Sequence, residues 1–462
     1  MLFNFWSAVL GGSIERVYQG ACAARRNRRL ILLDRYFKLT ENRTSVKQEM
    51  LGGVTTFVTM AYVIVVNPQI LAHTGMPVDG VVFATCLASA IATLVMGLYA
   101  NYPIALAPGM GLNAYFTYSV CLAMHIPWQT ALGVVFLSGV LFLMLTVTRV
   151  REQLVNGIPD GLKHSTAAGI GMFIAFLGMR NAKLIVANSA TLVGLGSFHD
   201  KEVQTACIGL VLTLILMARR IHGAFLLGVI GTALLGMLRG VSSWPTRFFA
   251  LPHVSGTFLQ LDLRSAIHLG FLEILFAFLF VDLLDNVGTL VAVCEQGGFV
   301  KDGKIPRAGR ILIADSIGTI FGSLTGTSTV TSYVESAAGV AAGARTGLAN
   351  IPVAVLFLAA MFCSPLASAI PTYATAPALV VVGVLMSQSL SLIKWNDFTE
   401  ALPAFITMIA TPLSFSIATG LTFGVISYTV IKVAAGKLAE INLLIWILTI
   451  LFILRYIYLA AA

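Results

Sequence analysis

Apolar segments of about twenty residues, the length of a membrane-crossing helix, recur along almost the whole chain. Of the 462 residues, 58% are hydrophobic and only 11% are charged, and the mean hydropathy is +0.89. Because the interior of a bilayer offers no hydrogen-bond partners to the backbone, segments of this kind cross it as helices. The sequence therefore predicts an all-α polytopic membrane protein, and its composition excludes a soluble globular domain of this length.

The pattern of apolar segments predicts fourteen spans and one further apolar run. The predicted spans cover residues 52–72, 80–100, 103–123, 129–148, 163–180, 203–219, 222–238, 268–294, 309–326, 328–344, 347–364, 374–392, 402–417 and 418–434. Residues 1–50 form a basic N-terminal segment. An external connecting segment, 241–265, separates the first seven spans (51–240) from the second seven (266–436).

The apolar C-terminal segment, residues 437–462, has two interpretations. Its apolar run, 441–459, is either a fifteenth span or a helix that lies in the membrane interface. The sequence does not decide between them.

Basic residues mark one side of the membrane. Arg149 and Arg151 follow the fourth span and Arg219 and Arg220 follow the sixth, whereas the loops after spans one, three, nine and eleven contain no Lys or Arg. Short basic loops stay in the cytoplasm, so the N-terminus is predicted to be cytoplasmic in a multi-pass protein of the cell inner (plasma) membrane. The net charge of +9 is thereby explained by topology and does not indicate a nucleic-acid partner.

One stretch inside this pattern, residues 324–348, is too polar and too rich in glycine and alanine for an ordinary membrane helix. It contains Glu335, Tyr333 and a run of hydroxyl side chains that includes Ser332. A carboxylate at membrane depth is costly unless it is paired or faces a wet cavity. We expect an extended segment that leads into a half-length helix beside a ligand. A helix that packs through its small residues, with Glu335 satisfied locally, is the alternative.

A similar stretch, residues 102–116, lies in the third span. It has an extended start rich in proline and small residues, followed by a short helix that contains Met110, Gly111 and Asn113. Seven spans separate the two stretches, and an odd number inverts the second copy relative to the first. Paired interrupted spans in an inverted repeat mark a binding site at the membrane midplane. The sequence therefore predicts two inverted seven-helix repeats, with short interrupted helices in spans three and ten.

The eighth span carries acidic residues among Leu, Phe and Val. Asp282, Asp285 and Thr289 are spaced i, i+3 and i+7 and so share one helical face. Two carboxylates within one turn indicate a polar cavity, although Asp282 could instead pair with a neighbouring hydroxyl and only set helix packing. Asp315, at the start of the ninth span, is expected to cap a helix or to bind the neighbouring basic loop.

The motifs of enzymes and metal proteins are missing from the sequence. The six cysteines and seven histidines show no metal-ligand spacing, and there is no phosphate-binding loop or nucleophile motif. We therefore expect a protein that is not an enzyme and needs no metal or cofactor, with a proton as the coupling ion.

The chemistry that the sequence does offer is binding and proton transfer. Asp285 and Glu335 are acceptors, half-helices supply backbone N–H groups, and Tyr333 and Tyr115 supply flat apolar surface. This combination suits a small planar ligand with both donors and acceptors, such as a nucleobase. A carboxyl group buried at low dielectric can also take up and release a proton, which makes Glu335, Asp285 and Asp282 candidate proton-coupling residues.

Four stretches resemble the AzgA-like purine permeases of the nucleobase–cation symporter-2 and nucleobase–ascorbate transporter superfamily. They are residues 52–71, 100–120, 280–290 and 325–348, and the resemblance runs from about residue 35 to the end. It implies fourteen helices in two inverted repeats, with a core domain of spans 1–4 and 8–11 and a gate domain of spans 5–7 and 12–14. It also implies elevator-like motion of core against gate, commonly in a homodimer.

The resemblance also assigns residues. Related uracil permeases have a substrate-binding Glu in span eight and a Tyr-Gly-Glu triplet in span ten, which correspond here to Asp285 and to the run from Tyr333 to Glu335. A His one turn after their span-eight Glu is Thr289 here, so a histidine proton relay is not expected. The expected substrate-binding residues are Asp285, Glu335, Tyr333, Ser332, Thr289, Met110, Gly111 and Asn113.

The expected function is proton-coupled uptake of purine nucleobases. Adenine-preferring relatives tend to have Asn where this chain has Asp282, which favours hypoxanthine and guanine, with adenine as the other option. An anion exchanger on the same architecture is the alternative, but Asp285 and Glu335 would repel an anionic substrate.

Overall fold

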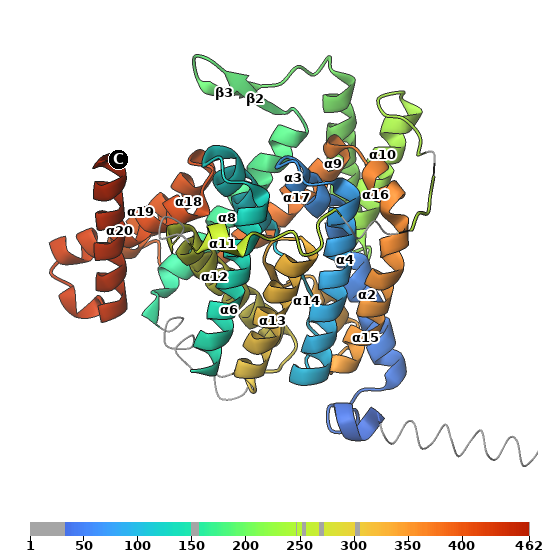
Figure 1. Ribbon diagram of the computed structural model, residues 1–462, viewed down its shortest axis with the longest axis horizontal. Coiled ribbons are helices and arrows are strands. Elements are labelled where there is room, and N and C mark those ends of the chain that lie inside the picture. Colours follow the sequence, from blue (N-terminus) through green and yellow to red (C-terminus); the bar gives the residue numbers. More distant parts are fainter. Residues whose placement is uncertain are drawn as a thin grey trace, which may run out of the picture.

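The computed structural model describes residues 33–148, 157–245, 247–251, 256–267, 272–300 and 305–461 (Figure 1). The predictions for residues 1–32 lie outside this range. Helices form most of the described chain, and eight of those described are long and apolar enough to cross a membrane. Shorter apolar helices accompany them. The protein is therefore a mostly helical, multi-pass membrane protein, as predicted.

A helix lies within every predicted span. In the first half these are α2 (Val46–Met60) continued by α3 (Val63–Ala72), α4 (Val78–Val95) continued by η1 (Met96–Ala100), α5 (Met110–Ala114) continued by the π-helix η2 (Tyr115–Ala123), α6 (Trp128–Val147), α8 (Asp160–Asn181), α9 (Lys201–Ala218) and α10 (Ala224–Leu238). In the second half they are α12 (Leu272–Gln296), α13 (Ala308–Thr325), α14 (Ser336–Ala341), η4 (Gly347–Ala349) with α15 (Asn350–Ala360), η5 (Met361–Cys363) and α16 (Ser364–Ala369), α17 (Thr372–Met386) with η6 (Ser387–Leu392), α18 (Phe398–Leu413) and α19 (Ile417–Ala434). A short helix, α11 (Leu263–Ala266), precedes the second half.

Two short, buried strands pair with each other, and the place where they pair is called the crossing below. Strand β1 (Leu106–Pro108) leads into α5 and strand β4 (Val330–Ser332) leads towards α14. They pair antiparallel, with Leu106 opposite Ser332 and Pro108 opposite Val330. The expected extended segments before the two short helices are thus present.

Side chains complete the hydrogen bonding of this extended backbone. The Asn350 amide donates to the carbonyls of Thr93, Tyr102 and Ile104 at 2.9–3.1 Å. The Thr319 hydroxyl donates to the carbonyl of Val330 at 3.0 Å. Non-helical backbone within a membrane requires such partners, which explains why polar side chains of neighbouring helices point to this crossing.

The prediction of an all-α fold needs correction, because the described chain contains a second two-stranded sheet besides the pairing of β1 with β4. A hairpin of β2 (Ile185–Asn188) and β3 (Leu192–Leu195) connects α8 to α9 and projects from the top of the molecule in Figure 1. Its turn is closed by the Asn188 side chain, which accepts hydrogen bonds from the N–H groups of Ala190 and Thr191 at 2.8 and 3.2 Å. Asparagine favours such a turn because its side chain mimics a backbone carbonyl.

Glycines let segments of the two halves touch through their backbones. A Cβ atom on Gly339 of α14 would lie 2.5 Å from the carbonyl oxygen of Gly52 in α2. A Cβ atom on Gly347 of η4 would lie 2.0 Å from the carbonyl oxygen of Gly97 in η1. Contacts this short exclude any side chain, so these glycines fix the spacing between the first and second halves of the chain.

The C-terminal apolar run forms α20 (Leu443–Ala461), which follows the short helix η7 (Leu438–Glu440). It runs antiparallel to α19 at the left edge of Figure 1. The hydroxyls of Thr429 and Thr449 are 2.7 Å apart, and the rings of Phe423 and Tyr456 stack with centroids 5.8 Å apart. These two contacts, nearly two turns apart on α19, show that the two helices pack antiparallel along this part of α19.

Candidate functional site

The candidate site surrounds the crossing of β1 and β4. Glu335 lies directly before α14 and is 8% exposed. Its carboxylate accepts a hydrogen bond of 2.8 Å from the hydroxyl of Tyr62, which sits in the break between α2 and α3. The helix break and the glycine contact between α2 and α14 place this tyrosine opposite the carboxylate.

A second carboxylate comes from α12. Asp285 is half-buried, and α12 packs on β4 and α14, the segments on either side of Glu335. A Cβ atom on Gly109, at the start of α5, would lie 3.8 Å from an Asp285 carboxylate oxygen. The structure therefore brings Asp285 and Glu335 to one region, next to the first turn of α5.

Tyr333 and Ser332 belong to the strand crossing itself. The Tyr333 hydroxyl donates a 2.6 Å hydrogen bond to the carbonyl of Pro108, and its backbone N–H donates to Ala105 at 3.0 Å. Tyr333 thus ties the two interrupted segments together. The Ser332 hydroxyl is buried and has no hydrogen-bond partner among the described residues. Buried hydroxyls normally have partners, so Ser332 is available to a ligand or to water.

The predicted residues of α5 play different parts. Asn113 is buried; its side-chain oxygen accepts a hydrogen bond from the Ser328 hydroxyl, while its amide nitrogen has no partner in the described part of the chain. Met110 is buried at the first position of the helix. Gly111 lies at a helix contact, where a Cβ atom would come within 2.5 Å of Ile170 on α8. Asn113 therefore offers a hydrogen-bond donor, and Gly111 allows close packing.

The acidic face of α12 extends in both directions from Asp285. Asp282 is fully buried one turn earlier, and Thr289 is half-buried one turn later. Asn286, beside this face, is buried, and neither of its amide atoms has a partner within the described residues. Several polar groups thus line one side of α12 where it passes the crossing.

Two side chains that the sequence reasoning misplaced or missed lie in this region. Asp315 does not cap α13; it is fully buried in the third turn of the helix, which starts at Ala308. Asn67 of α3 donates to the hydroxyls of Thr85 and Thr327 at 2.8 and 2.9 Å. For Asp315 and Asn67 alike, the sequence feature that indicates a place in the site is a polar side chain inside an apolar span.

Residues 47–425 match the model of a family described as "Permease family". The chain belongs to this permease family. It is 45% identical to the guanine/hypoxanthine permease PbuO of Bacillus subtilis, over 91% of this chain and 99% of that protein. It is 43% identical to the adenine permease AdeP of Escherichia coli, over 93% of this chain and 97% of that protein. The family predicted from the sequence, and its class as a transporter rather than an enzyme, are confirmed.

The fold is that of a known membrane transporter. The transmembrane domain of the cyanobacterial bicarbonate transporter BicA superposes with a TM-score of 0.62, covering 81% of this chain and 97% of that domain. Only 16% of the residues are identical, so the similarity concerns the fold.

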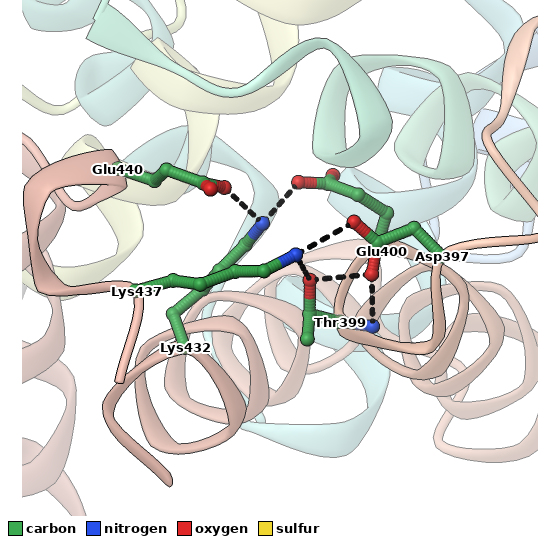
Figure 2. Close-up of polar contacts among 6 residues, drawn as sticks. All are labelled: Asp397, Thr399, Glu400, Lys432, Lys437 and Glu440. Carbon is green, nitrogen blue, oxygen red and sulfur yellow. Dashed lines mark hydrogen bonds and ion pairs between the residues drawn. The ribbon is translucent and has the colours of Figure 1, made fainter. Parts of the chain in front are cut away.

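A separate cluster of charged side chains lies where α18 begins and α19 ends (Figure 2). Lys432 is fully buried, and its ammonium group lies 2.7 Å from Glu400 and 2.5 Å from Glu440. Lys437 lies 2.9 Å from Asp397. Hydrogen bonds from these lysines hold the pKa values of Asp397 and Glu440 below their usual range. The cluster joins the start of α18 to the connection between α19 and α20.

Proposed function

We propose that this protein is a secondary active transporter that takes up purine nucleobases by proton symport, with hypoxanthine and guanine preferred and adenine as the other option. The observation that carries the proposal is the packing of α12, which bears Asp285, on β4 and α14 on either side of Glu335, where the two interrupted segments pair. Relatives named as guanine/hypoxanthine and adenine permeases support the substrate class.

The available groups suit a purine ring. Hypoxanthine and guanine carry a ring N–H beside a carbonyl group, so they need an acceptor next to a donor. An ionised Asp285 or Glu335 accepts from the ring N–H, and the amide of Asn113 donates to the carbonyl. The Ser332 hydroxyl adds a group that can donate or accept, and Thr289 borders the same region. Met110 and Gly111 directly follow Gly109, which lies beside the Asp285 carboxylate at the start of α5.

Proton coupling follows from the burial of the carboxyl groups. Glu335, Asp285 and Asp282 lie among apolar spans, where adjacent negative charges are costly. Binding a proton from outside neutralises one of them, and releasing it inside restores the charge. In this proposal the proton gradient thereby drives the movement of the core domain, with its bound purine and proton, across the membrane.

Helix packing supports division into a core and a gate. In the proposed core, α14 packs on α2, α15 on α4 and α13 on α6; in the proposed gate, α8 packs on α17 and α18, and α9 on α10. The core and gate domains are drawn from both inverted repeats, 51–240 and 266–436, and slide past each other as in an elevator. We propose a homodimer in the plasma membrane with a cytoplasmic N-terminus.

Uptake of radiolabelled hypoxanthine, guanine and adenine into cells without their own purine permeases tests this function. We expect accumulation that collapses when a protonophore is added. Asp285→Asn and Glu335→Gln should each lower it more than tenfold, about the effect of losing one charged hydrogen bond. Glu295→Gln, at an exposed position of α12, is the matched control and should transport normally.

Two results would overturn the proposal. The absence of purine uptake by protein that has reached the membrane would exclude the substrate class and favour the anion exchanger. Uptake that ignores the protonophore would exclude proton coupling.

A further inference from the structure

Tyr62 contacts two parts of the proposed transport machinery at once. Its side chain is 1% exposed, and its hydroxyl donates to the Glu335 carboxylate at 2.8 Å. Its ring stacks on Phe225 of α10, with centroids 5.3 Å apart and an interplanar angle of 28°. One side chain therefore links a candidate proton-coupling carboxylate to a gate helix.

The bond between Tyr62 and Glu335 lies within the proposed core. The glycine contact between α2 and α14 holds the two segments at a fixed distance. In the same region, the Thr59 hydroxyl lies 3.4 Å from the carbonyl oxygen of Glu335. Tyr62 and Glu335 therefore move together when the core moves.

The ring of Tyr62 lies at the boundary with the proposed gate. α10 packs on α9 and α17, which belong to the gate, and its first turn also touches α2. A Cβ atom on Gly223, immediately before α10, would lie 2.3 Å from a methyl group of Val58 on α2. The Tyr62–Phe225 stack therefore has to break or slide when the two domains move past each other.

We infer that Tyr62 is a positioning residue for transport. Its hydroxyl orients the ionised carboxylate of Glu335, and its ring couples the protonation state of that carboxylate to the contact with Phe225 at the core–gate boundary. This coupling is called the relay below. The inference rests on the proposed function. The bond from Tyr62 is strongest to the ionised carboxylate, because a charged acceptor strengthens it. When Glu335 takes up a proton, the hydrogen bond from Tyr62 weakens, and the Tyr62 ring can then move away from Phe225.

Other titratable groups near Glu335 must be considered in any test that varies pH. Among the described residues these are Tyr333, on the same segment, and Asp285, on α12. Tyr333 is held by Pro108, so it does not replace Tyr62 at the Glu335 carboxylate. A variant of Tyr62 that keeps its ring therefore changes one interaction of Glu335 and leaves these two groups in place.

The first test is Tyr62→Phe, which removes the hydroxyl and keeps the ring. Loss of a hydrogen bond to the ionised form favours the protonated form, so uptake should persist to a pH about one unit higher. Maximal rate should fall more than apparent affinity, because purine contacts remain. Tyr373→Phe, which removes a 2.9 Å hydrogen bond to Ser242 elsewhere, is the matched control and should leave the pH profile unchanged.

The ring is tested separately by Phe225→Leu. This variant should speed uptake by up to about tenfold, because it removes an aromatic stack that has to break when the two domains move. It should leave the pH profile as in the unmodified protein. Normal uptake by Phe225→Leu would overturn the relay.

A transport-independent measurement separates this inference from the proposed function. Infrared difference spectra of the purified protein over a range of pH report the carboxyl band that disappears in Glu335→Gln. Its titration midpoint should move upwards in Tyr62→Phe even if no purine is transported. An unchanged midpoint would overturn the role of the Tyr62 hydroxyl, whereas a shifted midpoint without purine uptake would overturn only the proposed substrate.

Discussion

Replacing Gly339 by alanine tests whether the spacing between α2 and α14 sets the geometry of the site. The new methyl group would lie 2.0 Å from the Thr56 hydroxyl and 2.5 Å from the Gly52 carbonyl oxygen. The hydroxyl can rotate away, but the carbonyl belongs to the backbone of a long helix. Real Cβ contacts are not shorter than 3.0 Å, so the two helices must separate by at least about 0.5 Å.

The size of the effect follows from this displacement. Overpacking a tight contact costs about 1–3 kcal/mol of stability. Glu335 lies one turn before Gly339, so its carboxylate moves with α14 relative to Tyr62. A displacement of 1 Å at a reacting group can lower the rate about a hundredfold, so the displacement of about 0.5 Å expected here should lower uptake about tenfold.

Gly309→Ala is the matched control, because a Cβ atom there meets no other atom within 4 Å. Alanine is also the better helix former, so this variant should be as stable as the unmodified protein or more stable. Thermal unfolding of the purified proteins and hypoxanthine uptake at equal expression measure both effects. If Gly339→Ala is as stable and as active as Gly309→Ala, the close contact between α2 and α14 does not set the site.

Two further predictions concern the C-terminal region. The pKa values of Asp397 and Glu440 are lowered in the folded protein, so their stabilisation is present above their ordinary pKa values and is lost as the pH falls through the lowered ones. The thermal unfolding temperature should therefore fall steeply below about pH 4.5, and less steeply in Lys437→Met; equal slopes would show that the cluster of Figure 2 is not responsible. Because α20 runs back along α19, we also predict that it crosses the membrane, so alkaline phosphatase fused to the C-terminus should be active and a fusion after Gly436 inactive. Inactive phosphatase in both fusions would place α20 in the interface.

Much of this architecture could be predicted from local sequence patterns. Hydropathy located the spans, because burial in lipid requires long apolar helices. The interrupted segments were recognisable because Glu335 and its hydroxyl neighbours are too polar for lipid, and Asp285 was recognisable for the same reason. These signals lie in a single stretch of chain and need no knowledge of what packs against it.

The contacts that hold the site together could not be predicted in this way. Tyr62 lies in an ordinary apolar span, and its role depends on a partner 273 residues away in the chain. The burial of Asp315 was not recognised, although the predicted span 309–326 begins within one residue of α13, because it depends on segments that are distant in the chain. The hairpin of β2 and β3 depends on a turn at Asn188. Turns of this kind occur in loops of many conformations, so the asparagine alone does not predict a hairpin.

The crossing of β1 and β4 also constrains how the protein is made. Tyr333 and Pro108, which are joined by a hydrogen bond, are 225 residues apart in the chain. During synthesis the segment with β1 therefore leaves the ribosome long before its partner exists, with part of its backbone unpaired. The first half of the chain must therefore stay in the membrane, or beside the insertion machinery, without this pairing until the segment with β4 has been synthesised. The centre of the transporter is thus among the last parts to be completed, and truncated chains that end before Val330 cannot form it.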